Sequence, residues 1–289
     1  MSKNLSELSG RKGLSDNLFS RLGELAIEDG TPKPEEMEKL AQEFLVGSAN
    51  AFGTASFYDF LKEDNKGKKV YVCNGTACLC AGTQEALIED LKGQFKAEEI
   101  GHMTCLGRCH ENSAFHYDGK NYSGNKSPVN DVIQNGQDKN IDDYRVAHSG
   151  PQILTAEFPG IETYYVPFLE AIKKDPAEVL EEIKKSNVRG RGGAGFPMGL
   201  KLEFCAKEPG DTKFIICNAD EGDPGAFSDR YLLEKQPHSV LLGMMVSGFV
   251  TGAEYGILYI RAEYPESVEI CKQAIDDLRD RKLIGKDIK

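Results

Sequence analysis

The chain contains VYVCNGTACLCAG at residues 70–82 and CLGRC at residues 105–109. These stretches place four cysteines in one Cys-x4-Cys and one Cys-x3-Cys pair: Cys73, Cys78, Cys105 and Cys109. A β-branched and aromatic run leads to the first pair, and a helical pattern follows it at residues 84–91. The segment therefore predicts a strand, a helix and a return ahead of the second pair, an α/β arrangement whose loops carry a metal centre.

Thiolates bind zinc and iron–sulfur clusters alike, so the four cysteines suit either centre. Structural zinc sites often use Cys-x2-Cys knuckles, and the longer spacings here favour an iron–sulfur cluster. Zinc and unligated buried thiols stay open as alternatives. Cys80 lies close enough to Cys78 to compete as a ligand. The other three cysteines are isolated and are expected in the core: Cys205, Cys217 and Cys271.

Composition narrows the class of protein. The 289 residues begin without an apolar signal segment and contain no hydrophobic run near the roughly 20 residues that span a bilayer. We therefore expect a cytoplasmic protein with no direct membrane insertion. With 35 Lys and Arg against 46 Asp and Glu, the formal charge is −11, which argues against nucleic acid as a partner.

Three zones are expected along the chain. Residues 1–62 have a helical pattern and predict a small bundle, residues 63–144 contain the four paired cysteines, and residues 145–289 form the last domain. The polar stretch at residues 121–143 has the composition of a connection between domains.

The last zone contains a glycine-rich segment, RGRGGAGFPMGLK, at residues 189–201. A helical pattern precedes it at residues 176–185, so the strand that a dinucleotide fingerprint requires is absent. Exposed amides of such a loop, with Arg191 and Lys201, can cradle an anion such as a flavin phosphate. Phe196 and Phe204 supply apolar planes nearby, and the negative overall charge disfavours an RGG-type nucleic-acid segment.

A second polar segment follows KFIIC at residues 213–217, which predicts a buried strand. The strand runs directly into NADEGDPG at residues 218–225. Polar side chains beyond the carboxyl end of a strand are where α/β folds place ligands. The same residues also favour an acidic turn for backbone reasons alone, and both interpretations stay open on these grounds.

The first half of the chain resembles a known family. GTASFYDFL at residues 53–61, VCNGTACLCAG at residues 72–82 and CLGRC at residues 105–109 follow one another as in the thioredoxin-like 2Fe-2S subunit of complex I. The resemblance implies that Cys73, Cys78, Cys105 and Cys109 are the cluster ligands. Where the family usually has a small-Pro-apolar segment, this chain has HENSAF at residues 110–115.

The second half resembles another subunit. RGRGGAGFPMGLK, then ICNADEGDPGAFSDR at residues 216–230 and YIRAEYPES at residues 259–267, are similar to the FMN- and NADH-binding subunit of complex I. The resemblance implies an FMN-binding set: Gly190, Arg191, Gly192, Lys201, Asn218, Asp220 and Glu221. It also implies NADH contacts from Phe196, Phe204 and Asp223, the last standing where the family usually has Glu.

Together the two resemblances imply a fused polypeptide like the diaphorase subunits of NAD-reducing hydrogenases and NAD-dependent formate dehydrogenases. The implied α/β fold is an N-terminal helical bundle, a thioredoxin-like ferredoxin domain and the first part of a Rossmann-like FMN-binding domain. The implied function is an NADH dehydrogenase module with FMN, a 2Fe-2S cluster and NAD(H), in a multi-subunit redox complex of hydrogenase, formate dehydrogenase or complex I type. No side chain is assigned a catalytic role.

The family continues beyond the region of residues 278–289 with a second flavin-contacting segment, a ubiquitin-like domain and a 4Fe-4S domain. The resemblance therefore leads us to expect an incomplete flavin domain and no 4Fe-4S cluster on this chain. An alternative function is a non-enzymatic 2Fe-2S electron-carrier or assembly subunit whose flavin site is completed by another polypeptide.

Overall fold

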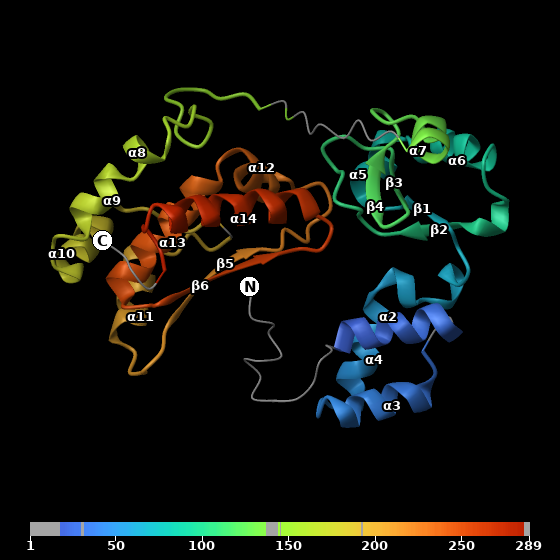
Figure 1. Ribbon diagram of the computed structural model, residues 1–289, viewed down its shortest axis with the longest axis horizontal. Coiled ribbons are helices and arrows are strands. Elements are labelled where there is room, and N and C mark those ends of the chain that lie inside the picture. Colours follow the sequence, from blue (N-terminus) through green and yellow to red (C-terminus); the bar gives the residue numbers. More distant parts are fainter. Residues whose placement is uncertain (1–17, 30–31, 137–143, 145, 192, 286–289) are drawn as a thin grey trace. The chain divides into compact units, whose positions relative to one another are not determined.

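The computed structural model describes residues 18–29, 32–136, 144, 146–191 and 193–285 (Figure 1). The chain divides into two compact units, Met1–Asp142 and Asp143–Lys289, and each combines helices with a sheet. This is the expected α/β class. The further boundary near residue 62 stays a prediction.

The described part of the first unit begins with the helices α2 (Leu18–Asp29), α3 (Pro34–Glu43) and α4 (Ser48–Phe57). Pro34 suits the first turn of α3, where its missing N–H costs nothing, and the Glu36 carboxylate accepts the Lys33 N–H at 2.9 Å. The helices share a buried apolar cluster: Leu22, Met37, Leu40, Ala55 and Leu61. The expected helical bundle is present. Two short turns, η1 (Asp59–Leu61) and η2 (Glu63–Asn65), lead from it to the sheet.

A four-stranded mixed sheet forms the centre of the first unit. Its strands are β1 (Val70–Cys73), β2 (Ile100–Met103), β3 (Ala114–Tyr117) and β4 (Lys120–Ser123), in the order β2-β1-β3-β4. β1 is parallel to β2 and antiparallel to β3, and β3 and β4 form a hairpin. The parallel pair needs a crossover, which α5 (Thr76–Ala81), α6 (Gln84–Lys92) and η3 (Ala97–Glu99) supply.

The core of this unit lies between the sheet and its helices. α6 packs on β1, and α7 (Val129–Asn135) packs on α6 (Figure 1). Phe115, fully buried on β3, stacks on Tyr122 of β4 with ring centroids 5.3 Å apart. The prediction of a connection over residues 121–143 is therefore wrong for residues 121–135. Most of their polar residues are exposed or half-buried, but Ser123 and Ser127 are buried. Only a few apolar side chains of this stretch are buried, among them Val129 and Val132.

The second unit contains a parallel pair of strands, β5 (Phe214–Ala219) and β6 (Tyr255–Ile260). Its helices, in chain order, are α8 (Ile161–Tyr164), α9 (Val166–Ala171), α10 (Pro176–Ser186), α11 (Met198–Lys207), α12 (Ser228–Lys235), α13 (Pro237–Thr251) and α14 (Pro265–Asp280). α13 packs on both strands and on four other helices: α10, α11, α12 and α14. It is the centre of this unit.

β5 forms as predicted, but it is not a buried strand. Phe214 and Ile216 are 40% and 63% exposed, and Tyr255 on β6 stacks on Phe214 at 5.3 Å. The physical reason is that α13 covers one face of the strand pair, and among the described residues nothing buries the opposite face. A continuous apolar run indicates a strand covered on both faces only when the chain supplies both layers.

We predict that Phe115→Ala lowers the free energy of unfolding of the first unit by about 3–5 kcal/mol, because the buried ring would leave a cavity beside Tyr122. Urea unfolding followed by circular dichroism measures the loss. Phe57→Ala is the matched control, since its ring is 77% exposed, and we expect a much smaller change. Equal effects of the two substitutions would contradict this account of the core.

Candidate iron–sulfur and flavin sites

The sheet of the first unit brings the four predicted cysteines together. Cys73 ends β1 and pairs in register with Met103 at the end of β2, so the following loops leave the same edge of the sheet. Cys78 lies on α5, directly after the first of these loops, and the second loop carries the other two cysteines. Three of the four thiols are buried, and Cys109 is partly exposed.

The thiols form two close pairs. The Sγ atoms of Cys105 and Cys109 lie 3.5 Å apart, and the Cys78 thiol hydrogen-bonds Cys73. Two irons with two thiolates each make up a [2Fe-2S] centre, and this pairwise grouping fits that composition. In the part of the chain that the structure describes, no three His, Cys, Asp or Glu side chains form a group suited to one metal ion.

Backbone N–H groups face the thiols of the first pair. Gly75 donates to Cys73 Sγ at 3.4 Å, Leu106 also donates to Cys73, and Ala114 donates to Cys78. The hydrogen bond from Cys78 lowers the pKa of Cys73, and the N–H donors of Gly75 and Leu106 lower it further. The same pairing with Cys73, followed by burial, raises the pKa of Cys78. The thiolate is the metal-binding form, so the N–H donors favour ligation at Cys73.

Close backbone approach holds the two loops against each other. A Cβ atom on Gly75 would lie 3.0 Å from the Cys105 backbone nitrogen and 3.3 Å from Cys73 Sγ. Cys105 itself has φ of 52° and Gly107 has φ of 74°, so the second loop turns sharply at its start. A Cβ atom at position 75 would therefore require these loops to move apart by a few tenths of an ångström.

The remaining cysteines lie elsewhere. Cys80 is exposed on α5. Cys271 is buried in the core of the second unit, Cys217 packs partly against it, and Cys205 lies on α11 with intermediate exposure. Burial raises the pKa of Cys271 to about 11, which keeps its thiol protonated at neutral pH.

We predict that Gly75→Ala lowers the iron bound per chain, because the added methyl group would separate the loop of Cys105 from β1. Iron analysis after anaerobic purification measures the effect. Gly93→Ala on the neighbouring helix end serves as the control, since its Cβ would meet only the Asp90 carbonyl at 3.2 Å. Full iron content in Gly75→Ala would contradict the importance of this contact.

In the second unit, the glycine-rich segment forms a closed loop ahead of α11. Its two ends meet through Gly190 N–H to Phe196 O at 2.9 Å and Met198 N–H to Val188 O at 2.9 Å. Gly193 has φ of 126°, a conformation that residues with a side chain rarely adopt. Gly192 lies outside the described residues. The described residues of this loop are mostly exposed, and because the Gly190 N–H is bonded to Phe196 O, an anion cradle would use other amides of the loop.

The cationic and aromatic residues predicted here are exposed around this loop. Arg191 lies within it, and Lys201 lies in the first turns of α11. Phe196 and Phe204 are 48% and 56% exposed, with ring centroids 6.3 Å apart and planes inclined by 46°. The two rings therefore present accessible apolar surface on one side of the loop.

The polar segment after β5 lies at the carboxyl ends of the parallel strands. Asn218 is the penultimate residue of β5, and its side-chain oxygen accepts the Asp220 N–H at 3.2 Å. Asp223 is exposed further along the loop. Arg261, the first residue after β6, donates to the Glu221 carbonyl at 2.8 Å and so ties the two strand-end loops together. Such an edge is a common ligand position in α/β folds.

Glu221 occupies a special place in this loop. It has φ of 44°, and its carboxylate accepts the N–H groups of Asp229 and Arg230 at 2.5 and 3.2 Å, in the first turn of α12. Ser228 and Tyr264 donate their hydroxyl groups to it at 3.1 Å each. A carboxylate at a helix N-terminus satisfies free N–H groups and the helix dipole. Any contact of Glu221 with FMN would come in addition to these bonds.

Sequence reasoning missed Arg261 and Tyr264 as individual residues of this edge. Arg261 stacks over the Tyr264 ring at 5.3 Å, and burial raises the pKa of the Tyr264 hydroxyl well above its usual range. The available signal was their place in YIRAEYPES at residues 259–267, one of the segments that carry the family resemblance. Their partner Glu221 is far away in the sequence and could not be identified from it.

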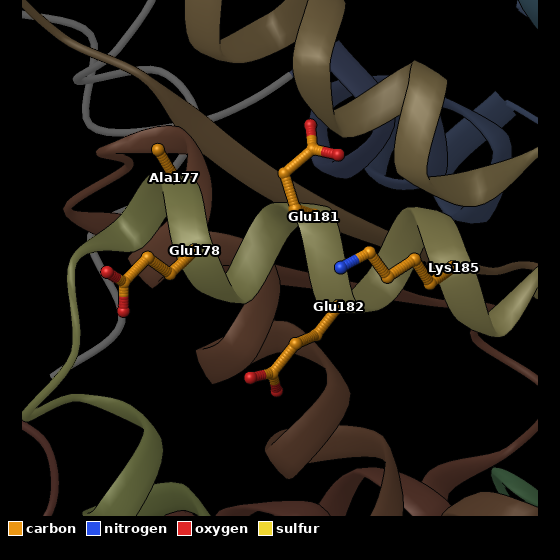
Figure 2. A pocket seen from close by; sticks show the side chains of 5 residues that line it. All are labelled: Ala177, Glu178, Glu181, Glu182 and Lys185. Atoms are coloured by element: carbon orange, nitrogen blue, oxygen red, sulfur yellow. The ribbon is translucent and has the colours of Figure 1, made fainter.

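A separate hollow lies on the surface of α10 (Figure 2). The side chains that line it are Ala177, Glu178, Glu181, Glu182 and Lys185. Four of the five are charged, and none belongs to the predicted FMN or NADH set. The hollow is therefore distinct from the predicted flavin residues.

We predict that Glu221→Ala destabilises the second unit by about 2–3 kcal/mol, because it removes a charged acceptor from two N–H groups of α12 and two hydroxyl groups. Thermal or urea unfolding measures the change. Asp223→Ala, in the same loop but exposed, should stay within about 0.5 kcal/mol of the parent. A parent-like stability of Glu221→Ala would show that these contacts contribute little.

Comparison with known families agrees with both halves of the chain. Residues 12–136 match the family of thioredoxin-like [2Fe-2S] ferredoxins, and residues 183–289 match the Nuo51 FMN-binding domain. The chain therefore contains, in order, a segment similar to thioredoxin-like [2Fe-2S] ferredoxins and a segment similar to the Nuo51 FMN-binding domain. Both resemblances expected from the motifs are confirmed, as is the α/β class.

Individual relatives contain one or both of these parts. The alpha subunit of NAD-reducing hydrogenase HoxS from Cupriavidus necator is 30% identical over 271 residues, covering 81% of this chain and 44% of that protein. NADP-reducing hydrogenase subunit HndC from Solidesulfovibrio fructosivorans is 47% identical over 124 residues, covering 43% of this chain and 25% of that protein. The chain thus spans less than half the length of these curated relatives.

A solved structure shows the same fold. The crystal structure of an NAD+-reducing [NiFe]-hydrogenase in the air-oxidized state matches with a TM-score of 0.61 at 24% identity, covering 92% of this chain and 50% of that chain. Among the described helices, none is long and apolar enough to cross a membrane.

Proposed function

We propose that the chain is an NADH dehydrogenase (diaphorase) module that passes electrons between NAD(H), FMN and a [2Fe-2S] cluster within a larger redox complex. The observation that carries this proposal is the presence, on one polypeptide, of two close thiol pairs in a thioredoxin-like unit and of a Nuo51 FMN-binding segment. Such a module combines FMN, which accepts two electrons at once, with a [2Fe-2S] cluster, which carries one electron at a time.

In the first unit, the cluster would be held by Cys73, Cys78, Cys105 and Cys109. Burial excludes water from three of the thiols, and N–H groups of Gly75, Leu106 and Ala114 stabilise negative charge on the sulfur atoms. Hydrogen bonds to sulfur and limited solvent exposure both influence a cluster's reduction potential. The chain's own contribution is thus to position and tune the centre.

In the second unit, the FMN phosphate would be bound by the loop amides near Gly190 and Gly192 together with Arg191 and Lys201. Asn218, Asp220 and Glu221 would approach the flavin from the edge at the end of β5. Phe196 and Phe204 would flank the NADH adenine, with Asp223 near the nicotinamide. When bound, FMN accepts a hydride and releases electrons singly, so no side chain is assigned a catalytic role.

The proposed partners are the other subunits of a multi-subunit redox complex. Relatives of each part are named as subunits of NAD- or NADP-reducing hydrogenases and of NADH-quinone oxidoreductase. The excess of acidic residues disfavours nucleic acid as a partner. A cytoplasmic location with no direct membrane insertion is part of the proposal.

One observation favours the alternative of an electron-carrier or assembly subunit. The side chains proposed to bind flavin and nucleotide are largely exposed, as at Arg191, Lys201 and Asn218, whereas ligand sites usually bury most of the ligand surface. In that case another polypeptide would complete the flavin site. Measured FMN content and NADH:ferricyanide activity distinguish the two functions.

We predict that anaerobically purified protein contains two irons, acid-labile sulfide and FMN, and that Cys105→Ala abolishes the cluster while leaving any flavin bound. The reason is that Cys105 supplies one of the four thiols and lies in the unit without the flavin residues. Metal, sulfide and flavin analysis with electron paramagnetic resonance measures both outcomes.

Cys80→Ala is the matched control, because its exposed thiol lies outside the four. A full [2Fe-2S] signal in Cys105→Ala would refute the ligand set. Zinc in place of iron would refute the redox function, and iron without FMN or NADH activity would favour the carrier subunit.

A further inference from the structure

The loop that carries Cys105 and Cys109 contains buried charges. The side chains of Arg108 and Glu111 are only 1% and 2% exposed, although each is ionisable. Taking a charge out of water is costly unless a partner and hydrogen bonds compensate for it. Two such groups beside the second thiol pair therefore point to a specific role for this loop.

The buried charges connect the loop to the β3–β4 hairpin. Arg108 donates from Nε to the Asn121 carbonyl at 3.3 Å and pairs through a terminal nitrogen with Glu111 Oε2 at 3.3 Å. The other carboxylate oxygen, Glu111 Oε1, lies 3.0 Å from Lys126 Nζ and 3.8 Å from His110 Nε2. One continuous network, the Arg108–Glu111–Lys126 network, joins the two segments.

Backbone contacts reinforce this connection where the loop is strained. Asn112 and Ser113 are consecutive residues with φ of 62° and 50°. Ser123 donates its hydroxyl to the Asn112 carbonyl at 2.9 Å, and Gly124 N–H donates to the Ser113 carbonyl at 2.8 Å. Left-handed backbone at residues other than glycine persists only when surrounding contacts hold it.

We propose that Arg108, acting with Glu111, is a positioning residue that fixes the Cys105/Cys109 pair relative to the Cys73/Cys78 pair. This inference rests on the proposed [2Fe-2S] centre. The network holds the second loop on the hairpin, while Gly75 and the β1–β2 pairing hold it on the first loop. The two thiol pairs thereby keep a fixed separation across the centre.

Arg108 directly precedes Cys109 in the chain and brings a permanent positive charge into this loop. A cluster gains negative charge on reduction, so a nearby buried cation stabilises the reduced form and raises the reduction potential. Glu111 offsets part of this charge, and Lys126 adds to it at a more exposed position. Positioning and charge can therefore be measured separately.

The test uses the full chain, purified anaerobically, with four variants: Arg108→Met, Arg108→Lys, Ser123→Ala and Ser127→Ala. For each, the rate of iron release to a chelator and the midpoint potential of the cluster are measured. We expect Arg108→Met to release iron about ten-fold faster or more than the parent, with a more negative potential. Arg108→Lys should restore the potential, because the charge remains, while iron release stays faster.

Ser123→Ala tests positioning without changing charge. It should accelerate iron release at an unchanged potential, because it removes a bond between the second loop and the hairpin. If Arg108→Met does not fold, the rate of iron release from Arg108→Lys decides the role of Arg108. Ser127→Ala is its matched control, since Ser127 is also buried and its hydroxyl has no hydrogen-bond partner among the described residues. It should match the parent.

Parent-like release and potential in Arg108→Met would overturn the positioning role and leave the cluster assignment intact. With Arg108→Met unfolded, parent-like release in Arg108→Lys would do the same. Absence of iron from the parent protein would instead overturn the cluster assignment, and the positioning role with it.

Discussion

Parallel pairing of β1 with β2 is the interaction on which the proposed metal centre depends. The ladder places Cys73 opposite Met103 and continues one step further, with Asn74 N–H donating to the Met103 carbonyl at 2.8 Å. Both cysteine loops therefore begin at the same edge, although a crossover with helices separates them in the sequence. Gly75 lets them approach closely. Without this pairing, neither thiol pair would have a defined position relative to the other.

A buried ion pair lies near the candidate site residues in each unit. In the first unit, Arg108 and Glu111 link a cysteine loop to a hairpin. In the second, Arg230 is fully buried and pairs with Glu234 at 2.8 Å and Glu266 at 3.2 Å, next to the helix terminus that the Glu221 carboxylate caps. A buried pair contributes little net stability, but removing one partner is costly. Such pairs therefore fix loop geometry more than they increase stability.

The two candidate sites differ in how far the described residues enclose them. Three of the four thiols are buried within a unit that has its own core. The flavin-side residues instead surround a strand pair with one exposed apolar face, where Phe214 and Ile216 remain accessible. An enclosed site controls its own electrostatics, because the surroundings of each group are fixed within the unit. The electrostatic surroundings of an exposed site depend on the solvent or the partner that covers it.

The sequence by itself determined the helices and strands with clear periodicity, the four-cysteine spacing and the order of the motifs that indicates an iron–sulfur and flavin polypeptide. These are local features, set by neighbouring residues. Only the tertiary structure decided that residues 121–135 form a strand and a helix, that β5 is half exposed, and that the Glu221 carboxylate caps α12. Burial and side-chain partners depend on residues distant in the sequence, such as Tyr264 for Glu221 and Asn121 for Arg108. Local patterns cannot specify those contacts, because a chain's periodicity is independent of what later packs against it.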